Sequence, residues 1–257
     1  MKIRNWVTSI LLGLWVPVLL VWVWYRVSID STNPYFPPLP DIWARFQENW
    51  VFALVPIHVV PSLRNLLIGY LIAVAVSIPL GVIVGASKSG GSYVEPVIDF
   101  VRSIPPVALV PIFILLLGLD SNMRIAAVTF SASFPILLSG IDAVKATNSV
   151  LLDTAHVFHL SKRQVLWRVR TPNAMPQIFA GLQVAFQVAF VVTIASEILG
   201  SGFGLGAFTL IAADSFMIID AWTGVILLGL LGYLLNLVFD IVERRSLRWY
   251  FGQKKLS

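Results

Sequence analysis

The stretch 149–172 is a polar segment between long apolar runs, and its residue types suit binding to a soluble partner. It reads SVLLDTAHVFHLSKRQVLWRVRTP. Leu151, Ala155 and Phe158 recur at spacings of four and three residues, which predicts one apolar face on a short helix. The cationic side chains of the stretch are Lys162, Arg163, Arg168 and Arg170. It is too polar to cross a bilayer, so we interpret it as a docking surface.

A second short helix has a defined start at Ser161. Ser161 and Gln164 form the S-x-x-Q pattern of a capping box. We expect this helix to end near Thr171, because a proline disfavours helical backbone at the residue before it. Pro172 then suits the first position of the next helix, with Thr171 as its cap.

A few polar side chains lie inside apolar runs and could line a passage for a solute. Gln183 and Gln187 are one helical turn apart on one face, and Glu197 lies near the end of the same run. Polar groups in hydrocarbon usually face a bundle interior or a water-filled cavity. Two interpretations stay open for the glutamines, which either line a pathway or join helices by hydrogen bonds. For Glu197, a structural hydrogen bond to the following glycine-rich loop is favoured over a gate.

The sequence offers no catalytic or metal site. The three histidines, His58, His156 and His159, are too few and too dispersed for a metal centre. The chain has no cysteine, which excludes disulfides and thiolate chemistry. The glycine-rich segments 85–92 and 200–206 lack the spacing of nucleotide-binding loops. We therefore expect a chain without enzymatic activity, cofactor or metal.

The composition is that of a polytopic membrane protein. The chain has 257 residues, of which 58% are hydrophobic and 12% charged, about half the charged fraction of a soluble domain. Several runs approach the length of about 20 apolar residues that crosses a bilayer. We predict an all-α protein with six transmembrane helices, at about 6–25, 66–86, 94–119, 125–141, 172–199 and 221–242.

The third predicted span is interrupted. Its apolar part, Val107–Leu119, is too short for a membrane, so Val94–Ser103 must contribute a helix that is interrupted at Pro105 and Pro106. A broken helix at membrane depth requires protein or water around its freed backbone groups. The two prolines are therefore a candidate pathway element, although a simple kink is the favoured interpretation. Ser133, in the fourth span, is a further candidate.

Glycines and a proline mark the second span. Gly81-x-x-x-Gly85 would let another helix approach closely, unless the pair arises by chance in a glycine-rich chain. Pro79 should bend the helix, because it removes a backbone donor.

The basic residues predict the orientation. The net charge of +5 comes from residues scattered at segment ends, which indicates membrane topology and not nucleic-acid binding. With both termini cytoplasmic, 13 of the 18 basic residues lie inside, and these are Lys2, Arg4, Lys88, Lys145, Lys162, Arg163, Arg168, Arg170, Arg244, Arg245, Arg248, Lys254 and Lys255. The stretch between spans four and five is then cytoplasmic.

The polar stretch resembles the cytoplasmic loop of permease subunits of bacterial ABC importers. That loop has the pattern E-A-A, three residues, Gly, nine residues, I-x-L-P. Ala155 and Pro172 match it, and Asp153 and Val169 are conservative replacements, whereas the positions that differ are Thr154, His159 and Thr171. Residues 39–249 are also similar to the sulfonate/taurine/nitrate branch, through RSIPPVALVPIFILLLGL at 102–119, PQIFAGL at 176–182 and SEILGSGFGLG at 196–206.

The resemblance implies a function and a set of partners. It implies a permease subunit in the bacterial plasma (inner) membrane that imports a small organic anion by alternating access. A cytoplasmic ATP-binding subunit would bind the ATP, an extracytoplasmic substrate-binding protein would deliver the solute, and a second permease subunit would complete the pathway. With one chain given we expect a homodimer, and a heterodimer stays open. The implied contacts with the ATPase are Asp153, Thr154, Ala155, Phe158, His159, Leu160, Ser161 and Pro172, with Ala155 and the turn at 159–161 closest to the partner.

The resemblance also divides the chain. Residues 1–62 form an anchor helix and external segment, 63–249 the permease core with the loop 145–172, and 250–257 a cytoplasmic tail. A left-handed backbone is implied at His159, because the family has glycine there.

The alternative functions that stay open are import of a neutral solute such as a pyrimidine or aromatic compound, a stand-alone carrier or channel, and a membrane-embedded enzyme.

Overall fold

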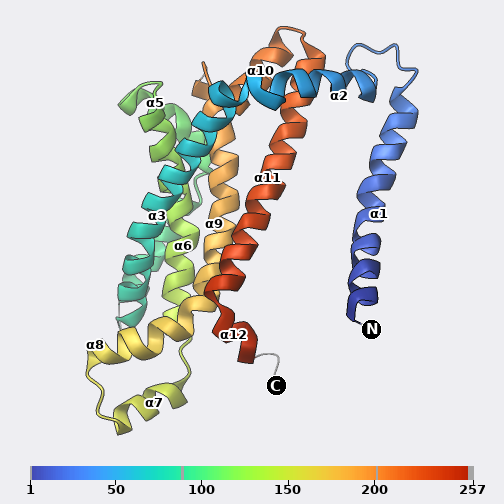
Figure 1. Ribbon diagram of the computed structural model, residues 1–257. Helices are drawn as coiled ribbons and strands as arrows, with labels where there is room; N and C mark the ends of the chain where they lie inside the picture. Colours follow the sequence, from blue (N-terminus) through green and yellow to red (C-terminus); the bar gives the residue numbers. More distant parts are fainter. Residues whose placement is uncertain (1, 88–89, 201, 254–257) are drawn as a thin grey trace. The chain divides into compact units, whose positions relative to one another are not determined.

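The computed structural model describes residues 2–87, 90–200 and 202–253, and every regular element in these ranges is a helix (Figure 1). The α-helices are α1 (Lys2–Ser28), α2 (Leu39–Glu48), α3 (Val60–Ala86), α4 (Gly90–Arg102), α5 (Val110–Leu117), α6 (Ser121–Lys145), α7 (Ser149–Val157), α8 (Lys162–Val165), α9 (Thr171–Gly200), α10 (Leu205–Asp214), α11 (Ile218–Ser246) and α12 (Arg248–Gln253). Single-turn helices of other pitch occupy Asn49–Ala53, Val55–Val59, Pro106–Leu109 and Leu166–Arg170. The expected all-helical fold is confirmed for the described residues. Lys88, Lys254 and Lys255, used in the charge count, lie outside them.

Four helical stretches in the described ranges are long and apolar enough to cross a membrane. They are Val55–Ala86, Ser121–Lys145, Lys162–Gly200 and Ile218–Ser246. Two further helices, Tyr93–Arg102 and Pro106–Leu117, pass the same test together and meet at a bend of 79°, so the described ranges contain four spans, or five if this pair is one span. The predicted interruption at Pro105 and Pro106 is confirmed. It is a break with non-helical backbone at residues 103–105, so the favoured interpretation as a simple kink is wrong. The chain is a multi-pass membrane protein.

The chain divides into two compact units. One comprises Met1–Pro56 and Phe208–Leu227, and the other comprises Ile57–Ala207 and Leu228–Ser257. The second unit contains the main apolar core, which lies between α3, α6 and α9. Buried side chains of this core include Leu66, Ala73, Val82, Ala127, Val128, Ala132, Ile136, Ile178, Ala185 and Ala189. Many of them are small, which lets the helices approach closely, as membrane helices do when van der Waals packing drives their association.

Gly81 and Gly85 are the clearest case of close helix packing. A Cβ atom added to Gly81 would lie 2.8 Å from the carbonyl oxygen of Leu137 and 3.2 Å from Cα of Gly140. A Cβ added to Gly85 would lie 2.7 Å from the carbonyl oxygen of Ile141. The two glycines of α3 thus face the backbone of α6. The close approach predicted from the Gly-x-x-x-Gly pattern is confirmed.

Candidate functional site

The loop between α6 and α9 consists of two short helices joined by a sharp turn at His159. α7 ends in a Schellman motif, in which the Leu160 amide donates to the Ala155 carbonyl at 3.0 Å and the His159 amide donates to the His156 carbonyl at 2.9 Å. His159 is left-handed, with φ of 51°. The left-handed backbone expected at this position is confirmed, with histidine where glycine is the usual residue.

The start of α8 is capped as expected. The Gln164 amide donates to Oγ of Ser161 at 3.4 Å, and the Ser161 amide donates to Oε1 of Gln164 at 2.8 Å. Both halves of the predicted capping box are therefore present. The cap and the Schellman motif meet within three residues, so the turn at 159–161 is held by hydrogen bonds on both sides.

The prediction that the second helix ends near Thr171 is wrong. Helical backbone continues without a break from Lys162 to Gly200. Thr171 has φ of −61° and ψ of −49°, so it is helical and does not cap α9. A π-turn at Leu166–Arg170 precedes Pro172, and Oγ1 of Thr171 donates to the Leu166 carbonyl at 2.9 Å. In an α-helix, a proline lacks the amide that bonds the carbonyl four residues earlier, and its ring collides with that carbonyl. The π-turn bonds carbonyls five residues earlier instead, and this wider turn accommodates the proline. α8 is therefore a direct extension of the span that contains α9.

The side chains of α7 differ strongly in exposure. Ala155 is only 3% exposed, so its methyl group is enclosed by this chain. Its contact with a partner stays a prediction, and within the chain its small size serves packing of the loop. Phe158 is 72% exposed and Val157 76%, and both carry large apolar side chains. They are the most exposed apolar groups of α7 and its C-terminal turn, where Val150 and Leu151 are exposed as well. The loop that carries them lies beyond the ends of α3, α6 and α9 (Figure 1).

Several other loop residues are polar or half-buried. Asp153, Thr154 and Ser161 are exposed, whereas Leu160 is half-buried. Oγ1 of Thr154 donates to the Val150 carbonyl at 2.7 Å, inside α7. Nη1 of Arg170 donates to the Ala86 carbonyl at 3.4 Å, which ties the base of the loop to the end of α3. A movement of the loop would therefore be passed to two spans, α3 and α9.

The pathway candidates separate into two groups. Gln187 is exposed and lines a cavity of about 340 Å³ together with Pro106, Val107 and Val191. A neighbouring cavity of about 270 Å³ shares Pro106 and contains Ser131. The break in the third span thus lies beside Gln187, and both cavities have mostly apolar walls.

Gln183 and Ser133 have partners inside the chain. Nε2 of Gln183 donates to Oδ1 of Asn236 at 3.3 Å and to Oδ1 of Asp240 at 3.1 Å. Of the two interpretations left open for the glutamines, Gln183 therefore follows the second and joins α9 to α11. Oγ of Ser133 donates to the Thr129 carbonyl at 2.6 Å, one turn earlier in its own helix. Pro105 is exposed in the break.

Glu197 is fully buried and holds the glycine-rich loop. Its Oε2 accepts a hydrogen bond from the Gly206 amide at 2.9 Å, as expected. Oγ of Ser62 accepts from the Leu205 amide at 3.0 Å. Gly204 is left-handed, with φ of 110°, and a side chain there would collide with the Glu197 carboxylate. Glu197 is therefore a structural residue in this conformation.

Arg124 completes this cluster, and sequence reasoning did not single it out. It lies in the first turn of α6, and its side chain is fully buried, with Cζ 4.1 Å from the centre of the Phe203 ring. It interacts electrostatically with Glu197. The only sequence signal was an arginine and a glutamate at the ends of two neighbouring spans, and spacing alone could not pair them.

Comparison with known proteins identifies the family. Residues 77–250, more than half of the chain, match the sequence profile of the family "Binding-protein-dependent transport system inner membrane component". The chain belongs to this family. It is the permease subunit of an ABC transporter and not an enzyme, and ATP is hydrolysed on a separate subunit.

The relatives share most of their length with this permease. The taurine transport system permease protein TauC of Escherichia coli (strain K12) is 26% identical over 93% of this chain and 89% of its own. The aliphatic sulfonates permease SsuC of Bacillus subtilis (strain 168), whose assignment is putative, is 24% identical over 92% and 87%. The bicarbonate transport system permease protein CmpB of Synechococcus elongatus is 30% identical over 74% and 68%.

A solved structure has the same fold. A chain of the MetNI methionine ABC transporter, in an inward-facing conformation, superposes with a TM-score of 0.65. The match covers 77% of this permease and 98% of that chain, at 19% sequence identity. The likeness shows that the two chains share the helical permease fold.

Proposed function

We propose that this permease imports a small organic anion of the sulfonate type by alternating access, as one of two identical subunits in the bacterial inner membrane. A cytoplasmic ATP-binding subunit drives it and an extracytoplasmic binding protein delivers the solute. The observation that carries the proposal is the loop at 149–172. Its turn is held by hydrogen bonds, and its second helix is continuous with the span of α9. The similarity to taurine and aliphatic sulfonate permeases supports the substrate class. Calorimetry that identifies the ligand of the binding protein tests the substrate class. A neutral ligand or bicarbonate would contradict it.

The proposed topology has six spans with both termini cytoplasmic. α1 supplies the first span, since it is a helix of 27 residues, long enough for a bilayer at about 1.5 Å per residue. Residues 1–62 then form the anchor and external segment, 63–249 the permease core and 250–257 the tail. The excess of basic residues at the inner ends supports this orientation.

The proposed coupling contact is the exposed apolar end of α7 with the turn that follows it. Phe158 and Val157 enter a cleft of the ATPase, and the turn at His159–Ser161 lies against its rim. Asp153 and Thr154 border the contact, whereas Ala155, Leu160 and Pro172 support the loop from within. A rigid connection to α9 then transmits ATPase movement to the pathway.

Substitutions in this loop should separate its surface from its backbone. Phe158→Ala is expected to lower ATP-driven uptake at least several-fold, because burying a phenylalanine in a partner contributes about 1.5–3 kcal/mol.

His159→Gly should leave assembly intact and raise stability slightly, because glycine adopts a left-handed backbone without strain. Uptake into proteoliposomes and co-purification of the ATPase measure both effects. Weaker assembly of His159→Gly would show that the imidazole is itself a contact, and normal uptake by Phe158→Ala would refute the coupling role.

The proposed pathway runs along Gln187 and the break at Pro105 and Pro106. Gln183→Leu and Gln187→Leu form a matched pair, one turn apart on one helix. Gln187→Leu should reduce uptake and leave thermal stability unchanged, because Gln187 is exposed and borders a cavity. Gln183→Leu should lower the free energy of unfolding by about 1 kcal/mol, since it removes hydrogen bonds to α11. Uptake and thermal unfolding are measured for both, and a reversed pattern would move the pathway to the other face of α9.

A further inference from the structure

The turn between α10 and α11 contains an aromatic residue in an unfavourable backbone conformation. Phe216 has φ of 57°; in the described ranges, His159 is the other non-glycine residue with positive φ. The Met217 amide donates to the Ala212 carbonyl at 2.8 Å and the Phe216 amide donates to the Ala213 carbonyl at 3.1 Å. This is a Schellman motif with Phe216 at the position where glycine is usual.

The fold does not require a phenylalanine at this position. A residue with a Cβ atom adopts the left-handed region only at a cost in free energy. The Phe216 side chain is 75% exposed, so burial inside this chain does not repay that cost. An exposed ring on a strained backbone is typical of a binding site, where the strain persists because the surrounding structure holds it.

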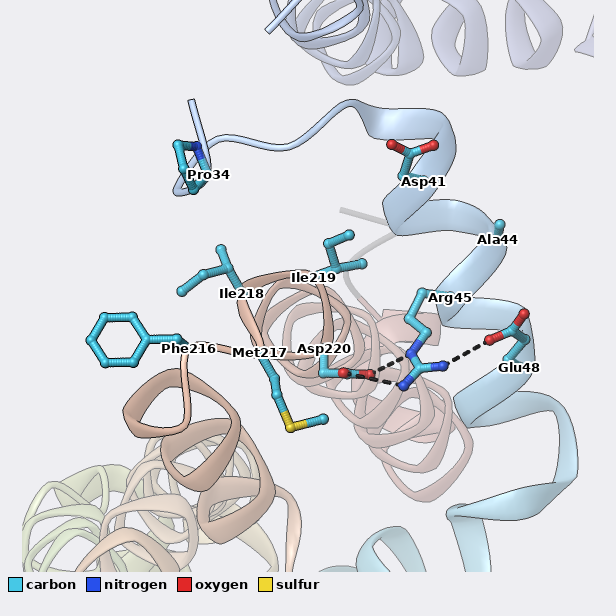
Figure 2. A pocket seen from close by; sticks show the side chains of 10 residues that line it. All are labelled: Pro34, Asp41, Ala44, Arg45, Glu48, Phe216, Met217, Ile218, Ile219 and Asp220. Carbon is cyan, nitrogen blue, oxygen red and sulfur yellow. Dashed lines mark hydrogen bonds and ion pairs between the residues drawn. The ribbon is translucent and has the colours of Figure 1, made fainter. Parts of the chain in front are cut away.

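Phe216 borders a cavity with a rigid polar wall. The cavity has a volume of about 620 Å³ and lies between α2 and the start of α11. Figure 2 shows Arg45 bridging Asp220 and Glu48, with the Phe216 ring directed away from this group. Nε of Arg45 donates to Oδ1 of Asp220 at 2.7 Å, and Nη1 donates to Oε2 of Glu48 at 3.0 Å.

Further hydrogen bonds fix the wall in place. Nδ2 of Asn49 donates to Oδ1 of Asp220 at 2.7 Å, and Nε1 of Trp50 donates to Oγ1 of Thr223 at 3.1 Å. The hydrogen bond to Asp220, followed by that to Glu48, raises the pKa of the Arg45 guanidinium, so it stays charged. A preorganised surface of this kind loses little entropy when a partner binds.

The charge of the cavity favours a protein partner over a membrane surface. Its lining contains three carboxylates, on Asp41, Glu48 and Asp220, and one guanidinium, on Arg45. Segments that lie on a bilayer are rich in lysine and arginine, because the lipid surface is negative. A partner that fits would present an apolar socket for the ring, bordered by basic side chains.

We propose that Phe216 and the acidic cavity beside it form the docking surface for the soluble substrate-binding protein. This inference rests on the proposed function, which places the turn on the outer side of the membrane. The ring is the central apolar anchor, and Asp41 and Glu48 form a charged rim that steers the encounter.

The test uses the complete transporter, this chain with its ATPase, in lipid nanodiscs. The concentration of binding protein that half-maximally stimulates ATP hydrolysis is measured for the parent and for Phe216→Gly. The glycine variant should need about tenfold more binding protein or more, with basal hydrolysis unchanged and thermal stability equal or higher. Asp41→Asn with Glu48→Gln should weaken binding several-fold and flatten its dependence on salt. Trp43→Ala, an exposed aromatic outside the cavity lining, is the matched control and should bind as the parent does.

Three results would overturn the inference. One is a Phe216→Gly variant that is stimulated like the parent. Another is a loss that appears equally without binding protein, which would assign the ring to lipid or to folding. If no binding protein stimulates the parent, the proposed function itself fails and the docking surface with it. Equal half-maximal concentrations for parent and variant refute the docking surface alone.

Discussion

Replacing Glu197 with leucine is expected to lower the free energy of unfolding by about 3–5 kcal/mol, because it breaks a buried charge interaction. The carboxylate is fully buried, accepts from the Gly206 amide and interacts with the buried Arg124. Leucine cannot accept a hydrogen bond or balance a guanidinium. A loss of this size is a large part of the stability of most proteins, so little folded permease should remain.

Glu197→Gln is the matched control. It keeps the acceptor for the Gly206 amide but removes the negative charge, so its stability should lie between those of the leucine variant and the parent. Thermal unfolding in detergent and the yield of monodisperse protein measure the series. Equal unfolding temperatures for the leucine variant and the parent would show that the carboxylate is not structural, and a gating role would then become the better interpretation.

Replacing Gly81 or Gly85 with alanine is expected to cost about 1–3 kcal/mol each, as overpacking does in a close-packed interior. The added Cβ atoms would meet backbone carbonyl oxygens of α6 at 2.8 Å and 2.7 Å. Backbone cannot rotate away as a side chain can, so the helices must separate. Alanine stabilises a helix relative to glycine, so helix propensity alone would make these variants more stable. A loss of stability is therefore a specific consequence of the contact with α6.

Gly229→Ala provides the comparison for these variants. Gly229 lies in a span as well, and among the described residues no atom beyond its chain neighbours and its own helix backbone lies within 4 Å of the added Cβ. Its alanine variant should therefore be as stable as the parent or slightly more stable. Unfolding temperatures for the three variants decide the matter, and a neutral Gly81→Ala would mean that α3 and α6 are less closely packed than described.

The features that the sequence determined by itself are local. The capping box at Ser161 and Gln164 involves two residues three apart, and the left-handed turn at His159 follows from its register in the loop. The break at Pro105 and Pro106 follows from covalent chemistry, because two prolines restrict the backbone before them and lack amide donors. The apolar runs likewise predicted the spans from length alone. Each of these depends on neighbours within one or two helical turns.

Tertiary structure decided which distant residues meet. Arg45 pairs with Asp220, and Gln183 with Asn236 and Asp240, across many intervening residues. Arg124 is buried with Glu197, a pairing that spacing along the chain does not indicate. Pro172 is accommodated by a π-turn, so the helix expected to stop continues into α9. These outcomes depend on how helices pack, because a buried polar group must find its partner wherever the fold brings one within reach.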